Sequence, residues 1–141
     1  MVYLRHQASK GDFIIIDEPE LNLHADNQVQ IARFFGRLIQ AGFKLLISTH
    51  SDYIIRELNT LIMLEAGMHH KKQETQALLE KYSYDSEELL AKERIGVYLF
   101  RLNQPVESVP VTETGFEIAT LDEVSERLNQ ISQDVYFQLF D

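Results

Sequence analysis

"FIIIDEPELNLH", residues 13–24, joins an apolar run to two adjacent carboxylates, Asp17 and Glu18, which Pro19 follows. Four consecutive large apolar residues predict a buried strand at 13–16. Adjacent acids at the end of a buried strand repel each other and resist burial, so they are best accommodated where a cation or a reacting water uses them. The stretch therefore predicts a functional site at the end of this strand.

A helix and a second strand are expected directly after this motif. Apolar side chains recur at helical spacing across residues 26–41, and Gly42 then predicts the end of the helix. The sequence KLLIST at 44–49 is a second short apolar run. A strand, a helix and a strand within about 35 residues are typical of a βαβ unit with parallel strands. We therefore expect strands 13–16 and 44–49 to be neighbours in one parallel sheet.

Polar side chains follow both expected strands. Asp17 and Glu18 follow the first strand, and Ser48, Thr49 and His50 follow the apolar part of the second. In an open parallel sheet, ligands bind outside the carboxyl ends of the strands. A carboxylate pair and an imidazole at one rim can support Mg²⁺ through water, orient an attacking water and contact a phosphate oxygen.

The rest of the chain has mixed helical and strand patterns. Helical spacing predicts further helices at 2–9, 51–58, 70–82, 85–92 and 121–140. Apolar runs predict further strands at 60–66, 95–102 and 108–119, the last bent at Gly115. The final helix is expected to be amphipathic, with one apolar face formed by Leu121, Val124, Leu128, Ile131, Val135 and Leu139.

Composition limits the classes of protein that fit. The 141 residues are 45% hydrophobic and 25% charged, as expected for one soluble domain. Cysteine is absent, and neither a signal-peptide core nor a membrane-spanning run is visible, so we expect a cytoplasmic protein with no membrane contact. The net charge is −9, and from Glu113 to Asp141 seven acids face one base, Arg127. Direct contact with nucleic acid is therefore not expected.

The two motifs together resemble the second half of an ABC-type ATPase domain. FIIIDEPELNLH followed by LLISTHSDYI is similar to AAA-like and overcoming-lysogenization-defect-like ATPases, which are related to the RecF and SMC heads. The resemblance covers residues 1–65 by motif. It implies an α/β, P-loop NTPase-like fold with a partial parallel sheet flanked by helices. A β-hairpin-like pair and a closing amphipathic helix would follow at 95–141.

The resemblance also implies a role for each residue of the motifs. Asp17 looks like the Walker B aspartate that supports Mg²⁺ through water, Glu18 like the catalytic carboxylate, and His50 like the switch histidine at the γ-phosphate of ATP. Ser48 and Thr49 would belong to the nucleotide-binding rim. The residues of the D-loop, which crosses a dimer interface in this family, would be Leu21, Asn22, Leu23 and His24. His24 and the following Ala25 depart from the aspartate and proline that are frequent there.

Two motifs of such ATPases are missing from the sequence. It contains neither the G-x-x-x-x-G-K-[ST] phosphate loop, also called Walker A, nor the serine-glycine signature motif. In the family both lie upstream of Walker B, so we interpret the chain as the C-terminal part of one ATPase domain: a shortened gene product, one subunit of a split protein, or a segment excised from a longer protein. Its parts would be 1–65 (Walker B to switch), 66–94 (helical) and 95–141. It would use Mg²⁺ and ATP only when completed, either as a homodimer or with a complementing N-terminal ATPase half.

Other interpretations of the same residues stay open. Asp17 and Glu18 would be solvated acids if a loop began there, and His50 alone would more often be structural. Glu20 and His24 have the spacing of a metal pair on a helix, and a metal-dependent hydrolase would use His24 together with Asp17, Glu18 and His50. The sequence HHKK at 69–72 has the composition of a metal or phosphate patch, but we interpret it as the solvated start of a helix. The chain could also be a non-catalytic interaction module with an ATPase-like fold.

Overall fold

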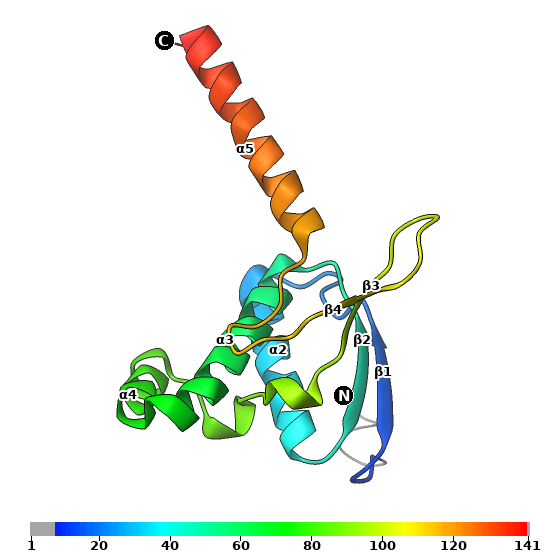
Figure 1. Cartoon of the computed structure of the whole chain (residues 1–141), viewed down its shortest axis with the longest axis vertical. Coiled ribbons are helices and arrows are strands. Elements are labelled where there is room, and N and C mark those ends of the chain that lie inside the picture. The colour runs from blue at the N-terminus through cyan, green and yellow to red at the C-terminus, as the bar shows by residue number, and fades with distance from the viewer. Residues whose placement is uncertain (1–7, 141) are drawn as a thin grey trace. The chain divides into compact units, whose positions relative to one another are not determined.

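The computed structural model describes residues 8–140, with the side chains of all of them except 119–126 and Phe140. They form two compact units: unit 1 comprises residues 8–96 with Val111–Gly115, and unit 2 comprises Val97–Pro110 with residues 116–140. Figure 1 shows the order of the elements. Most of the helix expected at 2–9 lies outside the described residues, and Ala8 and Ser9 are not helical. None of the described helices is both long and apolar enough to cross a membrane.

Unit 1 begins with the expected βαβ arrangement. Strand β1 (Phe13–Asp17) pairs in parallel with β2 (Lys44–Ser48), and α2 (Ala25–Gln40) connects them. The helix ends before Gly42, whose φ of 95° is a backbone conformation that glycine adopts without strain. The prediction of two neighbouring parallel strands joined by a helix is therefore confirmed.

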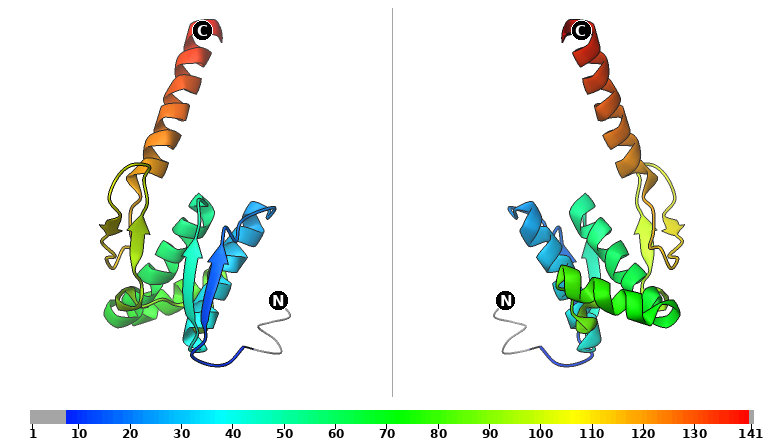
Figure 2. Two further views of the ribbon diagram at one scale, coloured as in Figure 1. Left: turned by 90° about the vertical axis from the view of Figure 1, so that its right-hand side faces the viewer. Right: turned by 90° about the vertical axis from the view of Figure 1, so that its left-hand side faces the viewer.

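The two faces of this sheet differ in exposure. Alternate residues on one face are partly buried: Ile14, Ile16, Leu45 and Ile47. The other face exposes 60% of Phe13, 68% of Ile15 and 53% of Leu46. In the left panel of Figure 2, β1 and β2 lie in front of α2, so the helical layer of unit 1 covers only one side of the sheet. Among the described residues of unit 1, the second face has no covering layer.

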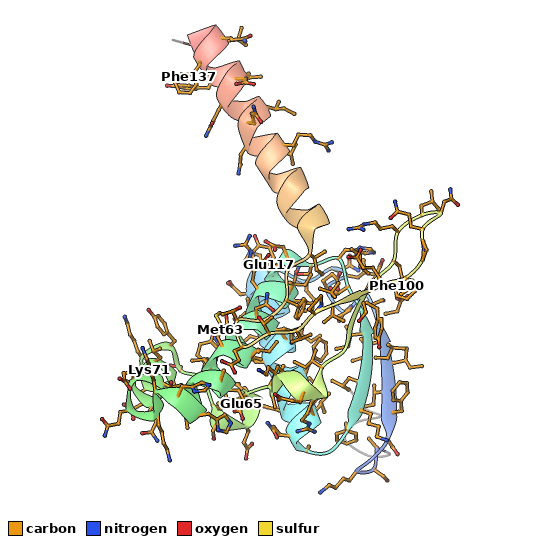
Figure 3. The ribbon with its side chains drawn as sticks, in the orientation of Figure 1. Met63, Glu65, Lys71, Phe100, Glu117 and Phe137 are labelled. Atoms are coloured by element: carbon orange, nitrogen blue, oxygen red, sulfur yellow. The ribbon has the colours of Figure 1, made fainter. Side chains whose placement is uncertain are left out.

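Helix α3 (Asp52–His70) is much longer than the helix expected at 51–58. The strand expected at 60–66 was wrong, because these residues continue the helix. Met63, labelled in Figure 3, is 45% exposed in the middle of the apolar run. The buried apolar residues instead follow helical spacing: Ile54, Ile55, Leu61, Ile62 and Leu64. The helix starts where expected, since the Ser51 hydroxyl accepts a hydrogen bond from the backbone N–H of Ile54 at 3.1 Å.

The remainder of unit 1 packs beside α2 and α3. Helix α4 (Lys72–Tyr82) agrees with the expected helical region, and Leu79 on it joins a buried cluster with Leu64 and Leu89. The helix expected at 85–92 is replaced by two 3₁₀ turns, Ser86–Glu88 and Lys92–Arg94. Between these turns the backbone at Leu89 is extended, and both Leu89 and Leu90 are buried.

Unit 2 contains a short hairpin and a long helix. Strands β3 (Val97–Leu99) and β4 (Glu107–Val109) pair antiparallel, as expected, but they are shorter than the ranges 95–102 and 108–119. Pro110 lacks the N–H that a longer β4 would need. Helix α5 (Ala119–Phe140) agrees with the expected closing helix. Four residues of its expected apolar face are largely exposed: Leu128, Ile131, Val135 and Leu139.

Candidate active site

The parallel register of β1 and β2 brings their polar ends together. Asp17 lies opposite Ser48, and the Ser48 hydroxyl donates a hydrogen bond to the Asp17 carboxylate. The backbone N–H of Glu18 donates to both the Ser48 carbonyl oxygen, at 3.0 Å, and the Ser48 Oγ, at 3.2 Å. Polar groups that follow the two strands therefore form one connected rim, which we define as residues 17–24 and 48–51.

Glu18 has an unusual backbone at this rim. Its φ of 44° lies in the left-handed region, which few residues other than glycine adopt. Such a conformation costs on the order of 1–3 kcal/mol and persists only where the surroundings fix it. The two hydrogen bonds to Ser48 fix the Glu18 N–H here. Strain of this kind clusters at functional sites. It therefore favours a functional role for Glu18.

The side chains of Glu18 and His50 converge. Glu18 Oε1 lies 3.6 Å from His50 Nε2, with side-chain exposures of 39% and 86%. The separation is longer than a hydrogen bond but short enough for electrostatic interaction. A carboxylate and an imidazole that both contact solvent can act on the same water or bound ligand. The expectation that Glu18 and His50 face one rim agrees with this geometry.

The loop after Glu18 leads directly into α2. Backbone hydrogen bonds from Leu21 N to Glu18 O and from Leu23 N to Glu20 O close it tightly. Asn22 has a φ of 61°, which asparagine tolerates better than most residues. His24 is the N-cap of α2, and its Nδ1 accepts a hydrogen bond from the N–H of Asp26 at 3.4 Å. Leu21 is 62% exposed and the His24 side chain 77%, so this segment is accessible from solvent.

Two hydrogen-bonded connections join the loops that follow β1 and β2. Glu20 Oε1 accepts from the backbone N–H of His50 at 2.6 Å. Gln28 donates to the Leu23 carbonyl oxygen and accepts from the Ser51 hydroxyl. The sequence suggested Glu20 only as a metal partner of His24. In the structure Glu20 contacts His50, and His24 contacts Asp26. No local sequence signal identifies the Glu20 contact, because a glutamate in a loop is ordinarily solvated.

The donor chemistry of the rim suits a hard cation only through water. Within residues 8–140, no group of three or more histidine, aspartate or glutamate side chains is arranged to hold a metal ion. The structure therefore does not support the hypothesis of a metal-dependent hydrolase with Asp17, Glu18, His24 and His50 as ligands. Asp17 is exposed, with the Ser48 oxygen beside it, and carboxylate and hydroxyl oxygens are what Mg²⁺ prefers. These two residues fit a water-mediated magnesium contact.

A cavity of about 240 Å³ in unit 1 lies elsewhere, and no rim residue lines it. His69 and His70 line it at the end of α3, not at the helix start expected for HHKK. His69 Nε2 lies 3.3 Å from Glu65, and His70 Nε2 lies 3.4 Å from Glu113. A hydrogen bond from the Lys92 ammonium to Glu113, at 3.1 Å, lowers the pKa of that carboxyl. Both histidines thus lie beside acidic side chains, which would repel a phosphate.

Comparison with known proteins identifies one similarity. A family model described as an AAA ATPase domain matches residues 2–55. No curated protein matches the chain, and no solved structure does. The matched segment contains β1, α2, β2 and the whole rim. Residues 2–55 are therefore similar to an AAA ATPase domain.

Proposed function

We propose that this chain supplies the catalytic carboxylate and the switch histidine of an ATP-hydrolysing site. The observation that carries the proposal is the convergence of Glu18 and His50, 3.6 Å apart, at the carboxyl ends of two parallel strands. The similarity of residues 2–55 to an AAA ATPase domain supports ATP as the ligand. In this proposal the fold is P-loop NTPase-like and related to ABC-type, RecF and SMC heads. Its place of action is the cytoplasm.

Each rim residue has a distinct role in the proposal. The Glu18 carboxylate accepts a hydrogen bond from the attacking water and polarises it, because a carboxylate within hydrogen-bond reach raises the nucleophilicity of water. The exposed His50 imidazole contacts the γ-phosphate as negative charge develops on it. Asp17, beside the Ser48 and Thr49 segment, would support Mg²⁺ through water, and the bound ion would neutralise phosphate charge.

The proposed site needs a phosphate loop from another segment. The 141 residues contain no glycine-rich loop with a lysine to cradle the phosphates of ATP. We assign that part to a complementing N-terminal ATPase half that packs on the open face of the β1–β2 sheet. Phe13, Ile15 and Leu46 are exposed there, although parallel sheets are normally covered on both faces. Continuity of that face with the rim would bring the loop beside Glu18.

A second copy of the chain is part of the same proposal. The segment Leu21–His24 corresponds to the D-loop, which crosses a dimer interface in the ABC-type ATPases that the sequence resembles. Leu21 is 62% exposed at the surface, which is consistent with a contact made in a dimer. The homodimer would form on completion of the domain.

The isolated chain provides the first test. We predict that it binds ATP with Mg²⁺ weakly or not at all, because backbone amides and a lysine provide the main phosphate contacts of such sites. Isothermal calorimetry measures this directly. The same titration of the chain joined to a phosphate-loop half should give measurable affinity. Micromolar affinity of the isolated chain would contradict the division of roles proposed here.

A non-catalytic interaction module is the second candidate function. The exposed apolar residues of α5 favour it, since Tyr136 and Phe137 are 59% and 60% exposed beside the stripe that includes Ile131 and Val135. Phe137 projects from the helix in Figure 3. If the completed protein binds ATP but never hydrolyses it, while it still binds a partner through α5, this second function would be the better one.

A further inference from the structure

We propose that Glu20 is a positioning residue that sets the location of His50, an inference that rests on the proposed role of His50. Glu20 lies two residues after Glu18, in the loop that follows β1. Its Oε1 accepts a hydrogen bond from the backbone N–H of His50 at 2.6 Å. Hydrogen bonds to a carboxylate are shorter and about twice as strong as neutral ones.

The environment of Glu20 differs from that of a solvated loop acid. Its Oε2 is buried and has no hydrogen-bond partner among the described residues. Burying a carboxylate oxygen without a partner is unfavourable, so something must offset it. The short bond from the His50 N–H provides such compensation. The unfavourable burial of Glu20 Oε2 is therefore offset by a bond that holds the backbone at His50.

His50 needs this support because its ring is not held by packing. The imidazole is 86% exposed, so its position depends on the backbone that carries it. Glu20 ties that backbone to the loop that starts at Glu18. The Glu18 carboxylate and the His50 ring are thereby placed by one segment, residues 18–20, which accounts for their separation of 3.6 Å.

A second bridge between the same loops offers a matched control. Gln28 connects the Leu23 carbonyl oxygen to the Ser51 hydroxyl, at 3.0 Å and 2.5 Å. This bridge joins the two loops without contacting His50. Loss of this bridge would leave the His50 N–H bonded to Glu20, whereas loss of the Glu20 contact would release the His50 N–H itself.

Amide hydrogen exchange of the full 141-residue chain, followed by NMR, tests the inference without ATP. In Glu20→Ala, exchange of the His50 amide should accelerate by roughly tenfold or more, the loss expected for one hydrogen bond to a charged acceptor. Glu20→Gln keeps an acceptor and should retain most of the protection. In Glu20→Asp the side chain is one methylene shorter, so this variant should behave like Glu20→Ala. If Glu20→Ala does not fold, Glu20→Asp serves as the test variant. Gln28→Ala should leave the His50 amide protected.

Unchanged exchange of the His50 amide in both Glu20→Ala and Glu20→Asp would overturn the inference. Equal acceleration in Gln28→Ala would also overturn it, because the rim would then be loosened without specificity. In the completed ATPase, Glu20→Ala should lower kcat with little change in KM, and Glu20→Gln should restore much of it. If exchange responds as expected but the completed protein never hydrolyses ATP, Glu20 still positions His50 and the proposed function is the part that fails.

Discussion

At the scale of single residues, Glu18 provides the strongest evidence for a functional site at the rim. Two acids after an apolar strand predict a site, but the φ of 44° and the contact with His50 depend on a second strand 30 residues away. The hydrogen bonds from the Glu18 N–H to Ser48 explain why the strained conformation persists. The strained backbone of Glu18 and its contact with His50 distinguish it from Asp17, whose carboxylate accepts a hydrogen bond from the Ser48 hydroxyl.

A second cluster of residues contributes to how stability depends on alkaline pH. The Arg33 guanidinium lies 3.9 Å from the centre of the Tyr84 ring and bonds Glu57 at 2.7 Å, and the Tyr84 hydroxyl donates to Glu57 at 3.1 Å. Burial, and then the negative charge of Glu57, raise the pKa of Tyr84 above its ordinary value of 10.0. The folded chain therefore retains the Tyr84 proton at a pH where the unfolded chain releases it.

This shift predicts a loss of stability in alkaline solution. The contribution of Tyr84 is fully present below the unfolded pKa and declines as pH rises toward the folded pKa, because the folded state then binds more protons than the unfolded state. Urea denaturation between about pH 9 and 11 should show this decline, and Tyr84→Phe should reduce its slope. Tyr82→Phe, at an exposed neighbouring ring, is the control. An identical slope in Tyr84→Phe and the unaltered chain would contradict the prediction.

At the scale of elements, periodicity predicted residues 13–51 of unit 1 well. Strands β1 and β2 and helix α2 have distinct patterns bounded by glycine or proline, so local sequence was sufficient. The run TLIMLEA was ambiguous, since a short apolar segment fits a buried strand and a buried helix equally. Its burial comes from the packing of α3 against α2 and α4, which the local pattern of the run does not show. The Glu20 contact was missed for the same reason, because its partner is 30 residues away.

The close packing of α2 against the turn at Ser86–Glu88 predicts that a larger residue at Gly36 destabilises the chain. A Cβ atom at Gly36 would lie 2.0 Å from the Glu88 carbonyl oxygen, a backbone atom that cannot move without shifting the turn. Alanine normally favours a helix over glycine by about 1 kcal/mol, but this clash should outweigh the gain. Gly36→Ala should therefore destabilise the chain by roughly 1–3 kcal/mol in urea denaturation.

The control for this prediction is Gln30→Ala, at an exposed position of the same helix. It should change the free energy of unfolding only within about 0.5 kcal/mol. A Gly36→Ala variant as stable as the unaltered chain would show that the turn is not held closely against α2.

At the scale of the whole molecule, each unit leaves apolar surface exposed. In unit 1 it is the face of the β1–β2 sheet with Phe13, Ile15 and Leu46, and in unit 2 it is the stripe on α5. The sequence predicted both apolar patterns, but it could not predict which of them the chain itself covers, because that depends on tertiary packing. Under the proposed function, the open sheet face is where a phosphate-loop segment completes the site.

The most direct test of the central claim is the single-turnover rate of ATP hydrolysis by Glu18→Gln, in the chain joined to a phosphate-loop half. The amide keeps the shape of the side chain and removes a negative charge near the phosphates, so ATP binding should be retained. It cannot accept a proton from the attacking water, so the rate should fall by roughly 10²-fold or more. Glu74→Gln, an exposed acid on α4, should hydrolyse ATP at the unaltered rate. Hydrolysis by Glu18→Gln at that same rate would contradict the account and make the acidic pair structural.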